Sequence, residues 1–180
     1  MLGDKIVDRF KFSLRDIPKQ ELLNEYAERV TSLNANAVES CIALLRTAAD
    51  ISKVLDEHFL KYEISEGKFT ILTLLFRQSN YQLSPVELSK KADVTKGTMT
   101  GLIAGLENQG LVEKLTNIGD KRSYLVKLSS KGQELLNEIL PEHYKLIGEM
   151  MSILGDDQLK DMSLLLNLLS EKVVNLKGEK

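Results

Sequence analysis

The sequence has few of the residues that covalent and metal chemistry use. Its 180 residues include one cysteine, two histidines and no tryptophan. The lone Cys41 excludes an intrachain disulfide and is typical of a reducing compartment. His58 and His143 are too few for a zinc cluster, so we expect them to be structural, solvated or partly buried. A hydrophobic core must therefore hold the fold, and a chain of this length can supply one.

Other absences exclude whole classes of protein. No apolar run approaches the length of a membrane span, and residues 1–12 lack the apolar core of a signal peptide. We therefore expect a cytoplasmic protein with no membrane partner. The sequence also lacks a Ser-His-Asp set, a glycine-rich phosphate loop and a paired CxxC motif. An enzyme is not expected, nor is a cofactor or a bound metal.

Charge is distributed unevenly along the chain. The formal net charge is −2, which by itself argues mildly against a nucleic-acid partner. Residues 84–131, however, hold eight Lys or Arg and five Asp or Glu, so this block carries +3 and the remainder −5. A basic block on an acidic scaffold is typical of a protein that binds DNA through one region.

Apolar spacing predicts a mainly helical chain. Periodic apolar residues indicate helices over 17–33, 37–61 and 66–77, and the third is apolar nearly all round, which predicts burial. A long helix is expected from Ser130, with Gln133 completing a capping box and Pro141 kinking or dividing the helix. A last helix with a broad apolar face is expected from about Asp157 to Leu176.

Two short helices and a hairpin lie in the basic block. Ser84, Pro85 and Glu87 predict a helix start with a capping box, and Thr95 is expected to cap the next helix. Gly110 should end that second helix in a left-handed conformation. Alternating apolar residues then predict strands over 111–115 and 123–128, joined by turn residues 117–120.

Helix, short helix, tight turn, helix and hairpin form the order of a winged helix-turn-helix. The second helix has an apolar face and an opposite face that is slim enough to enter a major groove. The residues that we expect to face bases or phosphates from this helix are Thr95, Lys96, Gly97, Thr98, Thr100 and Gly101. An ordinary solvated helix start is the alternative for this segment taken alone.

The hairpin tip offers two further cations. Lys121 and Arg122 could reach phosphates or enter a minor groove, with Asp120 orienting Arg122 through a charge-assisted hydrogen bond. Lys91 and Lys127 are expected to contact the DNA backbone. A polar turn without a partner is the alternative for the tip.

As an ordered set, these motifs resemble the MarR family of transcriptional regulators. The segments that carry the resemblance are 83–89, 94–100, 106–107, 110–112, 119–122 and 128–132, with Asp120 and Arg122 matching the family's Asp-x-Arg wing motif. The resemblance covers roughly residue 37 to the C-terminus. It implies a homodimer with interlocked terminal helices, a palindromic operator on double-stranded DNA and, more often than not in the family, repression.

The resemblance also raises the question of an effector. Many relatives release DNA when a small aromatic or anionic ligand binds between the dimerisation and DNA-binding regions. The extra N-terminal helix is similar to that of the urate-responsive branch. That branch uses a tryptophan that this chain lacks, and arginines near the positions of Leu102 and Gly105, so urate itself is not expected. A regulator without an effector is the alternative.

Cys41 resembles in position the reactive cysteine of organic-hydroperoxide sensors. The tyrosines that support such a cysteine are replaced here by Leu45, Leu55 and Glu66. Cys41 also lies on the predicted apolar stripe of its helix, and burial makes a thiol inert. A structural cysteine is therefore favoured over a redox site.

We therefore predict a mainly α fold with a β-hairpin wing, a winged helix-turn-helix joined to a helical dimerisation region. The expected division is 1–62 for N-terminal dimerisation helices, 63–131 for DNA binding and 132–180 for C-terminal dimerisation helices. The expected function is sequence-specific DNA binding as a homodimeric regulator. The alternatives are a winged-helix protein-interaction module and a thiol-based redox regulator.

Overall fold

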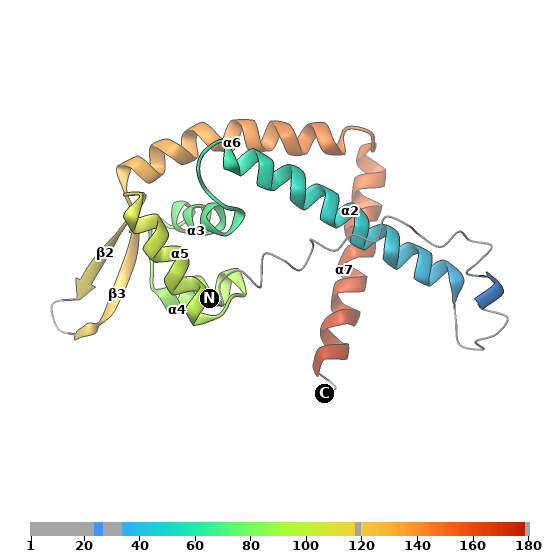
Figure 1. Ribbon diagram of the computed structural model, residues 1–180, viewed down its shortest axis with the longest axis horizontal. Coiled ribbons are helices and arrows are strands. Elements are labelled where there is room, and N and C mark those ends of the chain that lie inside the picture. Colours follow the sequence, from blue (N-terminus) through green and yellow to red (C-terminus); the bar gives the residue numbers. More distant parts are fainter. Residues whose placement is uncertain (1–23, 27–33, 118–119, 179–180) are drawn as a thin grey trace. The chain divides into compact units, whose positions relative to one another are not determined.

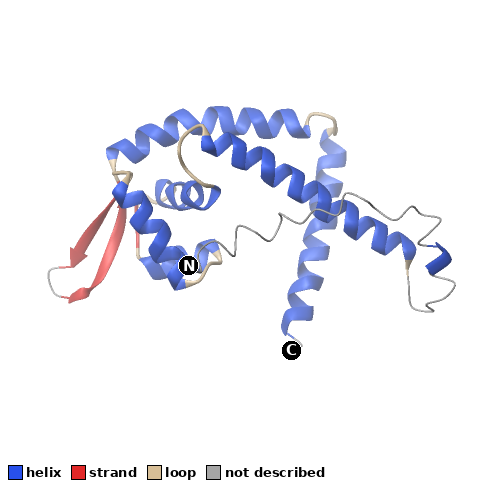
Figure 2. Ribbon diagram, viewed as in Figure 1, coloured by secondary structure: helices blue, strands red, loops and turns tan. Residues whose placement is uncertain are grey.

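The computed structural model describes residues 24–26, 34–117 and 120–178, except for the side chains of 116–123 and 177–178. Apart from the short N-terminal piece 24–26, the order is α2 (Ala35–Leu60), α3 (Glu66–Phe76), β1 (Gln82–Leu83), α4 (Pro85–Ala92), α5 (Lys96–Asn108), β2 (Val112–Asn117), β3 (Asp120–Leu128), α6 (Ser130–Met151) and α7 (Asp156–Gly178). The predicted mainly helical fold with one hairpin is confirmed (Figure 2). The helix expected over 17–33 lies outside the described residues, except for 24–26.

The chain forms two compact units, residues 1–136 and 137–180. The first unit contains α2 to α5, the sheet and the start of α6, and the second contains the rest of α6 and α7. Across the described ranges, no helix is both long enough and apolar enough to cross a membrane.

Helix α3 forms the centre of the first unit. Phe69, Ile71, Leu72 and Leu75 are buried, as its nearly continuous apolar sequence predicts. Ser65 caps its first turn, since its hydroxyl accepts a hydrogen bond from the Lys68 N–H.

The sheet has three antiparallel strands in the order β1-β3-β2. The β2–β3 hairpin extends away from α3, α4 and α5 (Figure 1), and β1 pairs with the other edge of β3 near its base. Both hairpin strands are longer at the tip than the sequence predicts, because Asn117 still pairs with Asp120 beyond the expected strand ends. Apolar Val112, Val126 and Leu128 anchor the hairpin base in the core.

The helix caps follow the sequence closely in the first unit. The Ser84 hydroxyl accepts from the Glu87 N–H while the Glu87 carboxylate accepts from the Ser84 N–H, which completes the predicted capping box of α4. Thr95 caps α5 through the Thr98 N–H, and Gly110 has the predicted left-handed φ of 71°. The tight turn between α4 and α5 passes through Asp93, at a left-handed φ of 51°.

The capping box expected at the start of α6 is wrong. The hydroxyl that caps the helix belongs to Ser129 and not to Ser130, since Ser129 Oγ accepts from the Gly132 N–H at 3.0 Å. Pro141 lies inside the helix and does not divide it, because the helix continues to Met151. The other expected effect of an interior proline, a kink, stays a prediction.

Gly132 allows the hairpin base to approach the start of α6. A β-carbon at this position would lie 2.3 Å from the Leu111 carbonyl oxygen and 2.7 Å from Leu128 Cδ1. The same Leu111 carbonyl accepts a hydrogen bond from the Ser129 N–H. Only a residue without a side chain fits at this corner.

The capping box predicts a pH dependence of stability. Hydrogen bonds from the Ser84 hydroxyl and backbone N–H lower the pKa of Glu87 below its ordinary value of 4.5. A group with a lowered folded-state pKa contributes stability above its unfolded-state pKa, and this contribution disappears as the pH falls through the folded value. Glu87→Gln should therefore destabilise the protein more at about pH 6 than at about pH 3.

Urea denaturation of both proteins at the two pH values measures this difference. Ser84→Ala, which removes the donating hydroxyl, should reduce the same pH dependence in part. An equal stability gap at both pH values would contradict the role of the carboxylate.

Candidate nucleic-acid interface

The packing of α5 fixes which of its faces is outward. Met99, Ile103 and Leu106 are at most 1% exposed and lie on one side of the helix. The opposite side presents Lys96, Gly97, Thr100 and Gly101, all exposed. Residues three and four apart on a helix share a face, so this outward surface is continuous over the first turns of α5.

The two outward glycines are not required by packing within the described chain. A β-carbon at Gly101 would meet no described atom within 4 Å, and one at Gly97 would meet only Thr95 Oγ1, at 3.9 Å. Glycine in a helix interior weakens the helix by roughly 0.5–1 kcal/mol relative to alanine. The two glycines therefore weaken α5, and no contact within the described chain requires them.

The hydroxyls at the start of α5 have local partners. Thr95 Oγ1 and Thr98 Oγ1 lie 2.9 Å apart, and Thr98 is only half-exposed. Thr100 Oγ1 donates to the Lys96 carbonyl at 2.9 Å. Thr98 is thus a partner of the helix cap, whereas Thr100 is exposed and its hydroxyl, which donates to Lys96, can still accept a hydrogen bond.

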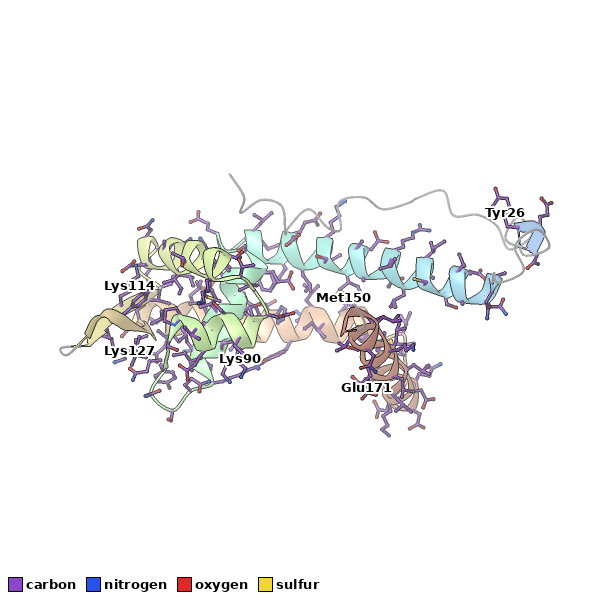
Figure 3. The ribbon with its side chains drawn as sticks, turned by 90° about the horizontal axis from the view of Figure 1, so that it is seen from below. Tyr26, Lys90, Lys114, Lys127, Met150 and Glu171 are labelled. Carbon is purple, nitrogen blue, oxygen red and sulfur yellow. The ribbon has the colours of Figure 1, made fainter. Side chains whose placement is uncertain are left out.

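The cations of the basic block fall into two groups; Figure 3 labels Lys90, Lys114 and Lys127 among them. Lys90 and Lys91 on α4 and Lys96 on α5 are exposed, and Lys127 on β3 is half-buried. Lys114 instead forms an ion pair with Glu107 of α5, which raises the pKa of Lys114, and its ammonium lies 5.6 Å from the Tyr124 ring centre. Lys131 donates to the Gln109 carbonyl at 2.8 Å. These last two lysines have partners within their own domain, which a count of charges does not reveal.

The predicted wing residues lie on the strand that returns from the tip. Asp120, Lys121 and Arg122 belong to β3, and Asp120 pairs with Asn117 across the hairpin. Their side chains lie outside the described part of the structure, so the expected Asp120–Arg122 bond stays a prediction.

The expected burial of Cys41 is wrong for the single chain. The thiol is exposed on α2, where the predicted apolar stripe is exposed or half-buried until Phe59; only His58 and Phe59 of this helix are buried. Within the described ranges, no three His, Cys, Asp or Glu are grouped so that they could hold a metal ion. His58 and His143 are both buried, more fully than the sequence suggested.

Sequence reasoning missed the residues that hold α5 in place. Lys68 of α3 contacts the C-terminal end of α5, although 41 positions separate it from its partner Gln109. Glu107 joins the same helix to the wing. No local spacing signals either contact, because the partners meet only after the chain has folded.

An outward slim helix, a supporting α3–α4 pair and a cationic hairpin define a winged helix-turn-helix DNA-binding protein. Residues 64–124 match the model of the MarR family. The chain is 36% identical over 149 residues to the transcriptional repressor YetL of Bacillus subtilis, an alignment that covers 83% of this chain and 89% of YetL. The chain belongs to the MarR family and is a transcriptional regulator rather than an enzyme.

Other relatives and solved structures that are similar to this chain are also regulators of the same kind. The regulator PecS of Dickeya dadantii is 29% identical over 133 residues, which cover 73% of this chain and 80% of PecS. A MarR mutant from E. coli, solved with operator DNA, superposes with a TM-score of 0.64 at 26% identity and covers 74% of this chain and 96% of its own. The DNA complex of Sco3205 from Streptomyces coelicolor has a TM-score of 0.72 at 22% identity, covers 78% and 89% of the two chains, and supports the fold alone.

The open space at Gly101 predicts a stabilising substitution. Gly101→Ala adds a β-carbon that meets no described atom and removes the conformational freedom of glycine from the unfolded chain. We expect a gain of about 0.5–1 kcal/mol in the free energy of unfolding, measured by urea denaturation.

Gly132→Ala is the matched contrast, because its β-carbon would overlap the Leu111 carbonyl. Overpacking of this kind costs about 1–3 kcal/mol. Destabilisation by Gly101→Ala would mean that position 101 is packed after all.

Proposed function

We propose that the chain is a repressor that binds a palindromic operator as a homodimer. The observation that carries this proposal is the outward face of α5, which is slim at Gly97 and Gly101 and cationic at Lys96. A helix of this shape fits a major groove, and the free N–H groups of its first turn favour phosphate. Lys91 and Lys127 would contact the DNA backbone, and Lys121 and Arg122 would contact the DNA from the wing, with Asp120 orienting Arg122.

Uncovered apolar side chains support a dimer. Within the second unit, α7 leaves seven large apolar residues at least 42% exposed: Leu164, Leu165, Leu168, Leu169, Val173, Val174 and Leu176. Within the first unit, α2 exposes Leu44, Leu45 and Val54. Apolar surface of this extent marks an interaction site, and a second copy of the chain is the partner that the family relationship supports. The predicted division of the chain, with dimerisation helices at 1–62 and 132–180 around the DNA-binding region 63–131, is part of this proposal.

Two copies would present two α5 helices to one duplex. A two-fold symmetric dimer reads half-sites about one helical turn apart, roughly 10 base pairs. This geometry explains why the proposal includes a palindromic operator.

Release by a small aromatic or anionic effector belongs to the same proposal. A solved relative in fold, BpsR of Bordetella bronchiseptica, is described as regulated in DNA binding by 6-hydroxynicotinic acid and has a TM-score of 0.62 with this chain. Its 22% identity supports the fold alone, so the chemistry of an effector for this chain does not follow from it.

DNA binding is tested with duplexes from the region directly upstream of the chain's own gene. Lys96→Ala and Arg122→Ala should each weaken binding and lower the slope of log affinity against log salt by about one, because each removes one phosphate contact. Gel shifts or fluorescence anisotropy over a salt series measure both quantities.

Lys53→Ala is the matched control, since Lys53 is exposed on α2 outside the basic block. Its salt slope should equal that of the wild type. Unchanged slopes in the Lys96 and Arg122 variants would remove those residues from the interface. No binding by the wild type at physiological salt would favour the alternative, a winged-helix module that binds a protein.

The dimer is tested by placing charge on the apolar face of α7. Leu165 and Leu169 lie one helical turn apart and are 65% and 46% exposed. The double variant Leu165→Lys/Leu169→Lys should sediment as a monomer and bind the upstream duplex more weakly, because a monomer engages one half-site.

Val86→Lys is the matched control for oligomeric state, since Val86 is 64% exposed on α4 in the other unit. It should remain a dimer. A dimeric double variant would show that this face of α7 is not the interface.

A further inference from the structure

Helices α3 and α5 contact each other through two glycines. A β-carbon on Gly67 of α3 would lie 3.3 Å from Leu102 of α5, and one on Gly105 of α5 would lie 3.0 Å from Lys68 Cε of α3. Each helix thus supplies a small residue against which a long side chain of the other lies. The Lys68 stem passes over Gly105 because no side chain occupies that space.

Hydrogen bonds continue from this crossing to the turn before α3. Lys68 Nζ donates to Gln109 Oε1 at 2.6 Å, and Gln109 Nε2 donates to the Glu63 carbonyl at 2.8 Å. Glu63 lies in the connection between α2 and α3 and has a left-handed φ of 57°. The Gln109 side chain therefore joins the α2–α3 turn, the first turn of α3 and the C-terminal end of α5.

Electrostatics favours this arrangement. The C-terminal end of a helix carries partial negative charge on its last carbonyls, which cations stabilise. Lys68 reaches this end from α3, and Lys131 reaches the Gln109 main-chain carbonyl from α6 at 2.8 Å. Neither lysine lies on the outward face formed by Lys96, Gly97, Thr100 and Gly101.

We propose that Lys68 and Gln109 are positioning residues for DNA binding. They fix the C-terminal end of α5 against α3 and the α2–α3 turn, and so set the angle at which the N-terminal half of α5 meets the groove. A helix fixed at one end and buried along one face keeps a single orientation. Loss of the Lys68–Gln109 contact leaves the apolar contacts and the Lys114 and Lys131 contacts, none of which reaches α3 or the α2–α3 turn through a polar bond. This inference rests on the proposed DNA-binding function.

Three substitutions weaken the contact of Lys68 and Gln109, which we call the pin, in different ways. Lys68→Met keeps an apolar stem over Gly105 and removes the ammonium. Gln109→Met removes both amide contacts. Gly105→Ala adds a β-carbon 3.0 Å from Lys68 Cε, so that the lysine side chain must shift, while alanine raises helix propensity.

The experiment measures affinity of the full chain for the upstream duplex over a salt series, together with thermal unfolding. We expect each variant to bind roughly three- to thirtyfold more weakly, the range by which residues that couple two sites alter affinity. The salt slope should stay at the wild-type value, because no phosphate contact is lost. The Lys68→Met/Gln109→Met double variant should be no weaker than the weaker single variant, since both act through one contact.

Gly105→Ala distinguishes positioning from general destabilisation. We expect its thermal midpoint to be equal to or above that of the wild type while its DNA affinity falls. If Lys68→Met or Gln109→Met fails to fold, Gly105→Ala alone decides. Lys53→Met, on the exposed face of α2, is the matched lysine control and should bind as the wild type does.

Three outcomes would overturn the inference. Wild-type affinity in a folded Lys68→Met or Gly105→Ala variant would show that the pin has no effect on DNA binding. A salt slope lower by about one in Lys68→Met would make Lys68 a phosphate contact instead. Failure of the wild type itself to bind the duplex would overturn the proposed function, a result distinct from wild-type binding with unaffected variants.

Discussion

Burial of one face of α5 is the constraint on which the rest of the structure depends. Met99, Ile103 and Leu106 are enclosed by the core, so the rotation of the helix about its axis is fixed by hydrophobic packing. The same packing decides that the glycine-containing side points outward. Had the apolar residues been offset by one position, a different set of side chains would face solvent, and the slim surface would be lost.

Some of the cations around α5 face outward, and others bind partners within the protein. Lys96 is outward, whereas Lys114, Lys131 and Lys68 each have a polar partner at or near the C-terminal half of the helix. The net charge of a segment therefore overstates how many of its cations are available to bind a polyanion. A chain with an overall charge of −2 can still present a cationic surface, provided that its acidic residues lie elsewhere.

Much of the fold was predictable because its signals are local. The Ser84–Glu87 capping box and the left-handed Gly110 are each encoded within a few residues, and the structure confirms them. The cap of α6 was misplaced by one residue, because adjacent serines at 129 and 130 offer the same local signal and only the contact with the hairpin base decides between them. Burial of α2 could not be predicted from its stripe, since a periodic apolar face does not say whether its own chain covers it.

The outward residues of the candidate site could also be predicted from the sequence, since they follow from the cap and the helical period. The residues that hold α5 in place could not be predicted in this way. The contact between Lys68 and Gln109 spans 41 positions, and no pattern in either segment names the other. The sequence thus indicates which surface faces a ligand, while the orientation of that surface depends on tertiary contacts.

Gly132 has a consequence for how this protein can change. The hairpin base and the first turn of α6 meet where the Leu111 carbonyl occupies the place of a side chain. Mutational drift at this corner is barred by sterics, whatever DNA the protein reads. The restriction comes from the backbone of the hairpin base, so it holds whatever side chains the wing carries.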